Sequence, residues 1–246
     1  MTEYKEQFGV VVLLDYLGVK NMMKKEHLEH LHKWLRTRDG IIQFSKTEAE
    51  KSRLKMLDRA RKLKVQDYNR EHKTKLKSFE DIPQPRLDLK NLFVYPEPRT
   101  FQDTIVITYP ANDILNNSLL YKFVNDILLN LFTTSLKQGY LIRGAISIDL
   151  FINDERSNTV VGPAVTKAVN WYEKAQWGGI VVEPESEDLV AALLKEAEAE
   201  KRLELLKLNF LKYPVPIKEI IRSDDDFREE IQSKEMWALN WPLYMA

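Results

Sequence analysis

One stretch of the chain reads Val10-Val11-Val12-Leu13-Leu14-Asp15-Tyr16-Leu17-Gly18, an apolar run that ends at a single aspartate. A run of this length, rich in branched side chains, is typical of a β-strand that is covered on both faces. A second stretch, Phe101-Gln102-Asp103-Thr104-Ile105-Val106-Ile107-Thr108, places Asp103 just before another apolar run. A carboxylate at the edge of a buried strand is costly unless a partner stabilises its charge. The usual partners are a cation or a helix N-terminus, so two such edges indicate one metal site.

The composition favours a globular protein with one sizeable core. The chain has 246 residues, of which 44% are hydrophobic and 10% aromatic. Lys+Arg and Asp+Glu number 37 each, and this balance gives no global argument for a nucleic-acid or anionic-membrane partner. The absence of cysteine excludes disulfides, thiolate zinc sites and cysteine nucleophiles. The longest apolar stretch, residues 119–136, contains Lys122 and Asp126 and is too polar to span a bilayer, and no signal peptide is evident, so we expect a cytoplasmic protein.

The pattern of apolar residues predicts strands alternating with helices. Strands are expected at residues 8–15, 41–44, 92–95, 104–109, 141–152, 159–161, 180–183 and 236–241. Helices are expected at residues 19–38, 46–77, 112–139, 164–175 and 186–208, with Gly40 ending the first and Gly139 closing the third. The strands at 92–95 and 104–109 should form a hairpin with Asp103 at its turn. This order predicts an α+β sandwich with helices packed on a mixed sheet.

Residues 46–77 form a highly charged segment with few large apolar side chains. A helix of this composition is usually a solvated face of the protein. The alternatives are an exposed antenna or a dimer arm. Pro83 and Pro85 should end the helical pattern.

The residue types at these two strand edges already indicate metal binding. Asp15 and Asp103 are candidate ligands for two hard cations, Mg²⁺ or Mn²⁺, which prefer carboxylate oxygens. The turn at residues 16–19 opens a helix, and its backbone N–H groups should face the same place, as in other phosphate sites. Metal beside phosphate-binding backbone indicates nucleotide phosphoryl chemistry. The competing interpretation is that each acid is a turn or helix-cap residue.

Several motifs of this chain resemble those of class III nucleotide cyclases. Residues 12–19 resemble the first metal motif of that family, and Phe101-Gln102-Asp103 resembles the second, which lies in a hairpin. Residues 160–165, followed by a helix, resemble the later strand–glycine–helix element of the family. More narrowly, five segments in register resemble the pyrimidine cyclases of bacterial Pycsar anti-phage systems: residues 14–18, 101–106, 142–147, 161–164 and 237–242. The resemblance covers most of the chain except the charged segment.

The resemblance implies a fold and an activity. The fold would be a ferredoxin-type α+β sandwich with a mixed, mainly antiparallel sheet, forming one domain over residues 1–246 with a charged helical insertion at residues 46–90. Asp15 and Asp103, aided by the Tyr16 carbonyl, would bind two divalent cations, Mn²⁺ or Mg²⁺. UTP would be converted to 3′,5′-cyclic UMP and pyrophosphate, with CTP as the close alternative substrate. The family works as a head-to-tail homodimer, and the product would act on a separate cyclic-nucleotide-sensing effector, with neither nucleic acid nor membrane as a partner.

The chain also departs from the purine cyclases, and these departures bear on specificity. Thr166 and Asn170 stand where those enzymes carry an Asn and an Arg that serve the transition state. Arg143 or Lys167 would then have to supply the missing positive charge. The position of the base-selecting Lys is Arg99, and its Asp partner is replaced by Thr159. Substrate contacts are therefore expected from the turn Tyr16, Leu17, Gly18 and Val19, and from Arg99, Thr159, Thr166 and Lys167.

Other interpretations of the same residues remain open. Arg143 can simply pair with an acid beside its strand, and Arg99 can be a surface residue of the hairpin. Lys167 can be solvated or form an interface salt bridge of small value. A catalytically inactive cyclase-like domain that binds nucleotide and regulates a partner is a second functional class. A structural or interaction protein built around the charged segment is a third.

Overall fold

The computed structural model describes residues 5–19, 28–83, 98–110, 127–154, 156–188, 190–191, 210–223 and 226–239. Five expected elements fall wholly or partly outside these residues, one of them the strand at 236–241, of which residues 240–241 are not described. The other four are larger gaps. They are the strand at 92–95, the start of the helix at 19–38, most of the helix at 112–139 and most of the helix at 186–208. Among the described residues, no helix is both long and apolar enough to cross a membrane.

One sheet of eight strands organises the described part of the chain. The strands are β1 (Glu6–Tyr16), β2 (Pro98–Phe101), β3 (Thr104–Pro110), β4 (Ile142–Asp154), β5 (Thr159–Val161), β6 (Ile180–Val182), β7 (Phe210–Ser223) and β8 (Asp226–Leu239). Their order is β2-β3-β1-β4-β6-β8-β7, and β5 pairs with the distal end of β4. Among the described strands, β4 and β6 form the one parallel pair. The predicted mixed, mainly antiparallel sheet is therefore confirmed.

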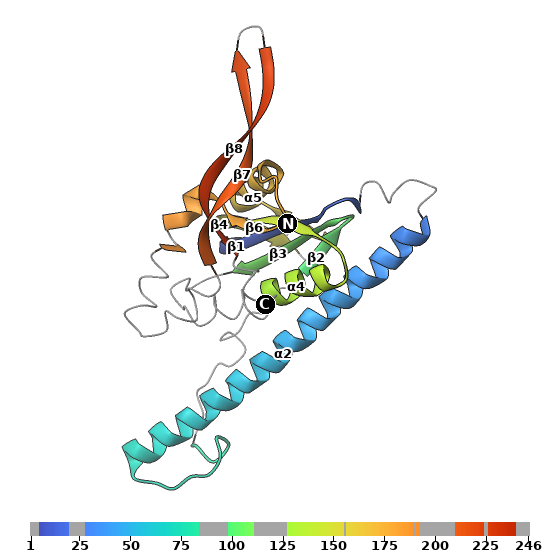
Figure 1. The fold of residues 1–246 in the computed structure, drawn as a ribbon. Helices are drawn as coiled ribbons and strands as arrows, with labels where there is room; N and C mark the ends of the chain where they lie inside the picture. The colour runs from blue at the N-terminus through green and yellow to red at the C-terminus, as the bar shows by residue number, and fades with distance from the viewer. Residues whose placement is uncertain are drawn as a thin grey trace.

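Helices cover both faces of this sheet, as Figure 1 shows. They are α2 (Leu28–His72), α4 (Asn130–Lys137) and α5 (Pro163–Lys174). Successive side chains of a strand point to opposite faces. Val12 and Leu14 of β1 belong to the cluster that includes residues of α2 and α4, whereas Val11 and Leu13 pack with Ala164 and Ala168 of α5. The predicted sandwich of helices on a sheet is confirmed.

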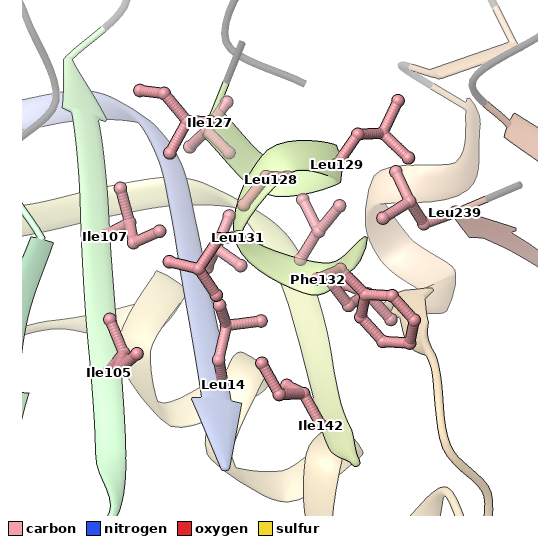
Figure 2. Packing of buried hydrophobic residues seen from close by; sticks show 14 of the residues in the cluster. Leu14, Ile105, Ile107, Ile127, Leu128, Leu129, Leu131, Phe132, Ile142 and Leu239 are labelled. Atoms are coloured by element: carbon pink, nitrogen blue, oxygen red, sulfur yellow. The ribbon is translucent and has the colours of Figure 1, made fainter. Parts of the chain in front are cut away.

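The core between the sheet and α4 fixes the end of β1. Figure 2 shows Leu14, Ile105 and Ile107 from adjacent strands meeting Leu131 and Phe132 of α4. All five side chains are at most 1% exposed. Because Leu14 is locked into this core, the next residue, Asp15, must point to the opposite face, where α5 lies.

The expectation that Gly40 ends a helix and that residues 41–44 form a strand is wrong. α2 runs without interruption through Gly40 as far as His72. Trp34, Ile41 and Ile42 are all buried, and their spacing places them on one side of the helix, against the core. Glycine inside a helix costs about 1 kcal/mol relative to alanine, which this packing outweighs.

The C-terminal region also differs from expectation. The expected strand at 236–241 is confirmed as far as residue 239, where it forms the end of the much longer β8. β7 and β8 form a long antiparallel hairpin that projects from the sheet (Figure 1). Pro214 and Pro216 lie inside β7, a segment outside every strand that the sequence pattern predicts. β7 is the outer strand of the sheet order, and an edge strand tolerates proline because one side of it needs no ladder partner.

Candidate functional site

Asp15 lies near the end of β1, between two neighbouring strands. It is opposite Thr104 of β3 on one side and Arg143 of β4 on the other. Nε of Arg143 donates a hydrogen bond to Oδ2 of Asp15 at 3.0 Å, and Nη2 lies 3.0 Å from the same oxygen. The Asp15 side chain is only 13% exposed and the Arg143 side chain 22%, so this ion pair is largely shielded from water.

An aromatic ring supports the cation of this pair. The guanidinium carbon of Arg143 lies 5.3 Å from the ring centre of Tyr172 on α5, a cation–π distance. Partial burial raises the pKa of the Tyr172 hydroxyl, so the ring stays neutral across the physiological range. Arg143 thus contacts Asp15 of its own chain. The competing expectation, pairing with an acid, is confirmed.

Asp103 comes to the same end of the sheet through the β2–β3 hairpin. Gln102 and Asp103 form a two-residue turn, and Gln102 has a left-handed φ of 54°. The Asp103 carbonyl accepts a hydrogen bond from the Tyr16 N–H at 3.4 Å. The predicted acid at a hairpin turn is confirmed, although its first strand is β2 and not residues 92–95. Asp15 and Asp103 are therefore brought to adjacent strand ends.

α2 braces this turn from the other side. Nη1 of Arg38 donates to the Gln102 carbonyl at 2.7 Å, and its Nε and Nη2 donate to Asp39. The Arg38 guanidinium also lies 5.0 Å from the ring centre of Trp34, and its side chain is 11% exposed. Sequence reasoning missed Arg38, because its partner is 64 residues away and nothing in the local pattern signals the contact.

The turn after β1 is less open to phosphate than expected. The Tyr16 N–H bonds to Asp103, and the Leu17 N–H donates to the Leu141 carbonyl at 2.9 Å. Gly18 and Val19 are then the remaining candidates of this turn for backbone contacts to phosphate. The Tyr16 ring belongs to the core: its hydroxyl lies 3.1 Å from Ser135 Oγ, and burial raises its pKa.

Arg99 and Thr159, the two positions expected to select a base, converge on one residue that the sequence did not single out. Nη1 of Arg99 donates to the Asp154 carbonyl at 3.0 Å, and Thr159 is the strand partner of Asp154. Ser157 Oγ donates to the Asp154 carboxylate at 2.6 Å and lies 2.9 Å from Thr159 Oγ1. The Ser157 hydroxyl, with backbone N–H groups, lowers the pKa of Asp154. A cluster of hydrogen-bonding groups thus gathers at the end of β4.

The remaining predicted site residues lie on α5. Thr166 and Asn170 are both exposed, one turn apart on the helix. Lys167 is turned inward: its Nζ lies 2.7 Å from Asp149 and 2.5 Å from Glu185. These two carboxylates raise the pKa of Lys167, and Lys167 in turn lowers the pKa of Asp149. Lys167 is therefore committed to ion pairs within its own chain, whereas the sequence predicted a substrate contact, a solvated side chain or an interface salt bridge.

The donor set at the end of β1 suits magnesium or manganese. Two carboxylates and a neighbouring carbonyl are hard oxygen ligands, and Mg²⁺ is commonly held by one or two carboxylates together with substrate phosphates. The described residues contain no cluster of three or more acidic or histidine side chains that would hold a metal without substrate. Arg143 currently supplies the positive charge beside Asp15, where a metal would otherwise supply it.

No protein-family model matches the chain, and no curated protein matches it in sequence. Two solved structures align with almost all of it. The catalytic core of a rhodopsin-guanylyl cyclase with converted specificity, in complex with ATPalphaS, is 10% identical, with a TM-score of 0.45 over 97% of this chain and 98% of that one. The adenylyl cyclase CyaB from P. aeruginosa is 11% identical, with a TM-score of 0.40 over 97% and 96%. Both TM-scores lie below 0.5, so these alignments by themselves establish no function.

Proposed function

We propose that this protein is a metal-dependent nucleotide cyclase that converts a pyrimidine nucleoside triphosphate, with UTP preferred, to its 3′,5′-cyclic monophosphate and pyrophosphate. The observation that carries the proposal is the placement of Asp15 and Asp103. The aspartates of both metal motifs come to neighbouring strand ends, and the backbone hydrogen bond from Tyr16 to Asp103 ties the two motifs together. The resemblance of both motifs to those of class III nucleotide cyclases indicates which reaction this site would catalyse.

Asp15, Asp103 and the Tyr16 carbonyl would hold two divalent cations, Mg²⁺ or Mn²⁺. Bound there, such cations supply Lewis-acid activation of the ribose 3′-hydroxyl and charge neutralisation on the triphosphate. In the reaction the 3′-oxygen forms a bond to the α-phosphorus, the bond to the β-phosphate oxygen breaks, and the hydroxyl proton leaves to solvent. Gly18 and Val19 offer backbone N–H groups to the phosphates. Arg143, beside Asp15, is the candidate to stabilise negative charge in the transition state.

The cluster at the end of β4 supports a pyrimidine base. Arg99 presents only hydrogen-bond donors, and its bond to the Asp154 carbonyl fixes its position near Thr159. Uracil offers two carbonyl acceptors, whereas adenine offers only ring nitrogens as acceptors, so a fixed guanidinium favours uracil over adenine. Cytosine keeps one of these carbonyls, and CTP is therefore the second candidate substrate. A site that hydrogen-bonds the correct base discriminates strongly, because the wrong base leaves buried polar groups unpaired.

A symmetric homodimer with composite sites completes the proposal. Thr166 and Asn170 match the transition-state positions of the purine cyclases, yet both are exposed on α5. An exposed pair of this kind suits a role in the partner's site and not in the site of its own chain. Isologous pairing is the commonest oligomer symmetry and would give two equivalent sites. The cyclic nucleotide would act on a separate effector that senses it, in anti-phage defence.

One observation favours a second function, an inactive domain that binds nucleotide and regulates a partner. Asp15 is already neutralised by Arg143, and neither Thr166 nor Asn170 can supply a guanidinium. In such a domain the ion pair would be purely structural.

Product identification separates the two functions. The purified protein is incubated with Mn²⁺ and each of the four nucleoside triphosphates, and products are identified by mass spectrometry. We expect cyclic UMP in the largest amount, cyclic CMP next, and little product from ATP or GTP. Equal or faster conversion of ATP would overturn the pyrimidine assignment, and nucleotide binding with no cyclic product from any substrate would favour the inactive domain.

A further inference from the structure

The balanced charge of the whole chain conceals a strong segregation. Residues 46–77 contain twelve Lys and Arg but only five Asp and Glu, a net charge of +7. The rest of the chain therefore carries a net charge of −7, since the totals are equal. Charge segregated in this way is an argument about partners and not about the fold.

This basic segment is held away from the body of the protein. The first part of α2, with Trp34 and Ile41, packs on the core, and the rest of the helix continues outward to His72 (Figure 1). The outer part, residues 46–72, is about 40 Å long at 1.5 Å per residue. Its end is fastened, because the Asn69 amide accepts the Leu76 N–H at 2.8 Å and donates to the Leu76 carbonyl at 2.9 Å. This segment, residues 46–77 and called the arm below, is thus a helix whose C-terminal end is held by side-chain hydrogen bonds.

Cations lie on two opposite sides of the arm. Lys55, Arg59 and Lys62 follow one another at i, i+4 and i+7 and therefore share one side of the helix. Arg61 and Lys64, with the same kind of spacing, lie on the opposite side. All five side chains are exposed. The ion pair of Lys62 with Asp58, at 2.7 Å, is on the surface and of small energetic value, so phosphate can replace it.

This distribution fits a nucleic-acid duplex better than a membrane. The exposed apolar side chains described in this segment, Leu54 and Leu63, lie nine residues apart and therefore on opposite sides of the helix, so they give it no single apolar side to bury in a bilayer. A duplex groove instead flanks a helix with phosphates on both sides, and the major groove of DNA is wide enough to admit one. We propose that the arm, residues 46–77, binds the phosphate backbone of a nucleic-acid duplex through cations on both of its sides, without reading sequence. This goes beyond the proposed cyclase activity and does not depend on it.

The test is a binding titration with a matched pair of variants. The arm variant carries Lys55→Gln, Arg59→Gln, Arg61→Gln and Lys64→Gln. The control carries Lys5→Gln, Lys137→Gln, Lys174→Gln and Lys212→Gln, four exposed residues of the body. Fluorescence anisotropy follows a labelled random-sequence DNA duplex of about 20 base pairs, longer than the ~40 Å arm, between about 50 and 200 mM KCl. A duplex RNA of the same sequence and anionic vesicles are the comparison ligands.

We expect wild type and control to bind duplex with micromolar affinity at low salt, and the logarithm of the binding constant to fall linearly with the logarithm of salt concentration. The arm variant should bind at least about tenfold more weakly, with a salt slope shallower by roughly 3 to 4, because four phosphate contacts are lost. Equal losses in both variants would overturn the proposal, as would absent duplex binding or arm-dependent binding to vesicles alone. Arm-dependent self-association without duplex binding would show that the arm's partner is the acidic body of a second copy, and would also refute it.

Discussion

The Asp15–Arg143 pair changes what a substitution at the site should do. From the sequence alone, two carboxylates near one metal site would repel each other, and removal of Asp15 would be harmless to the fold. In the structure, Arg143 neutralises Asp15 at 3.0 Å, and both side chains are largely shielded from water. Removal of either side chain takes a charge-assisted hydrogen bond away from the other, so stability and activity must be measured separately.

Arg143→Gln should destabilise the metal-free protein by about 1.5–3 kcal/mol, because Asp15 loses a charged hydrogen-bond donor in a shielded position. Chemical denaturation with and without Mn²⁺ measures this change. If a cation takes the place of the guanidinium, Mn²⁺ should stabilise the variant more than the wild type. An equal Mn²⁺ effect on both proteins would show that the metal does not compete with Arg143.

The ion pair of Asp149 and Lys167 predicts a pH dependence. Lys167 and a backbone N–H lower the pKa of Asp149 below its ordinary value of 3.8. The pair therefore contributes stability above about pH 4, and this contribution is lost as the pH falls through the lowered pKa. Thermal melts of Asp149→Asn and wild type should differ at neutral pH and converge in acid. A difference in melting temperature that stays as large in acid as at neutral pH would contradict the assignment.

For individual residues, the sequence predicted the two site aspartates but not the side chains that contact the predicted site residues. Asp15 and Asp103 could be predicted because Asp15 follows one apolar run and Asp103 precedes another, and apolar runs indicate strands. The Arg99–Asp154 contact joins residues 55 positions apart, and the Asp15–Arg143 contact joins residues 128 apart. Such contacts depend on strand order, which no local pattern encodes.

Among the elements, α2 shows tertiary packing overriding a local signal. Gly40 on its own predicts a helix end. Trp34 and Ile41 lie on the same side of the helix, and because both are buried in the core the helix continues past Gly40. The reverse holds at Gly139, which closes α4 with a left-handed φ of 82°, as predicted. The same residue type thus continues one helix and ends another, and only the packing distinguishes them.

Alanine substitutions at these two glycines should have opposite effects. A Cβ at either position meets no atom within 4 Å, so space does not distinguish them. Gly40→Ala should stabilise the protein by about 0.5–1 kcal/mol, because alanine is the better helix former. Gly139→Ala should destabilise it by about 1 kcal/mol, since L-residues disfavour left-handed backbone. Denaturant unfolding of both variants tests the pair, and changes of equal sign would contradict the account.

α2 should also control the turn that carries Asp103. Arg38→Met keeps much of the packing on Trp34 but removes the donor to the Gln102 carbonyl. If Arg38 positions the turn, cyclase kcat should fall and the Mn²⁺ concentration for half-maximal activity should rise, with partial rescue by Arg38→Lys. A kcat and Mn²⁺ requirement equal to those of wild type in Arg38→Met would refute a positioning role, whatever its effect on stability.

For the whole molecule, we expect the exposed Thr166 and Asn170 on α5 to contribute to the active site of the partner chain in a dimer. Asp103→Ala chains mixed with chains carrying Thr166→Ala and Asn170→Ala should form heterodimers with one intact composite site. Random exchange should then restore about a quarter of wild-type activity. A mixture of Asp15→Ala with Asp103→Ala is the matched control: both changes strike the same chain's metal ligands, so no site is repaired. Recovery in the control, or none in the test after verified exchange, would contradict the composite site.

The central claim is that Asp15 and Asp103 together make a cyclase. Its most direct test is the rate of cyclic UMP formation from UTP under saturating Mn²⁺, for wild type, Asp15→Ala, Asp103→Ala and the exposed control Asp188→Ala, each shown to be folded. We predict that the two site variants lose at least about a thousandfold in rate, roughly 4 kcal/mol of transition-state stabilisation, while the control keeps the wild-type rate. Near wild-type turnover in either site variant would contradict the account.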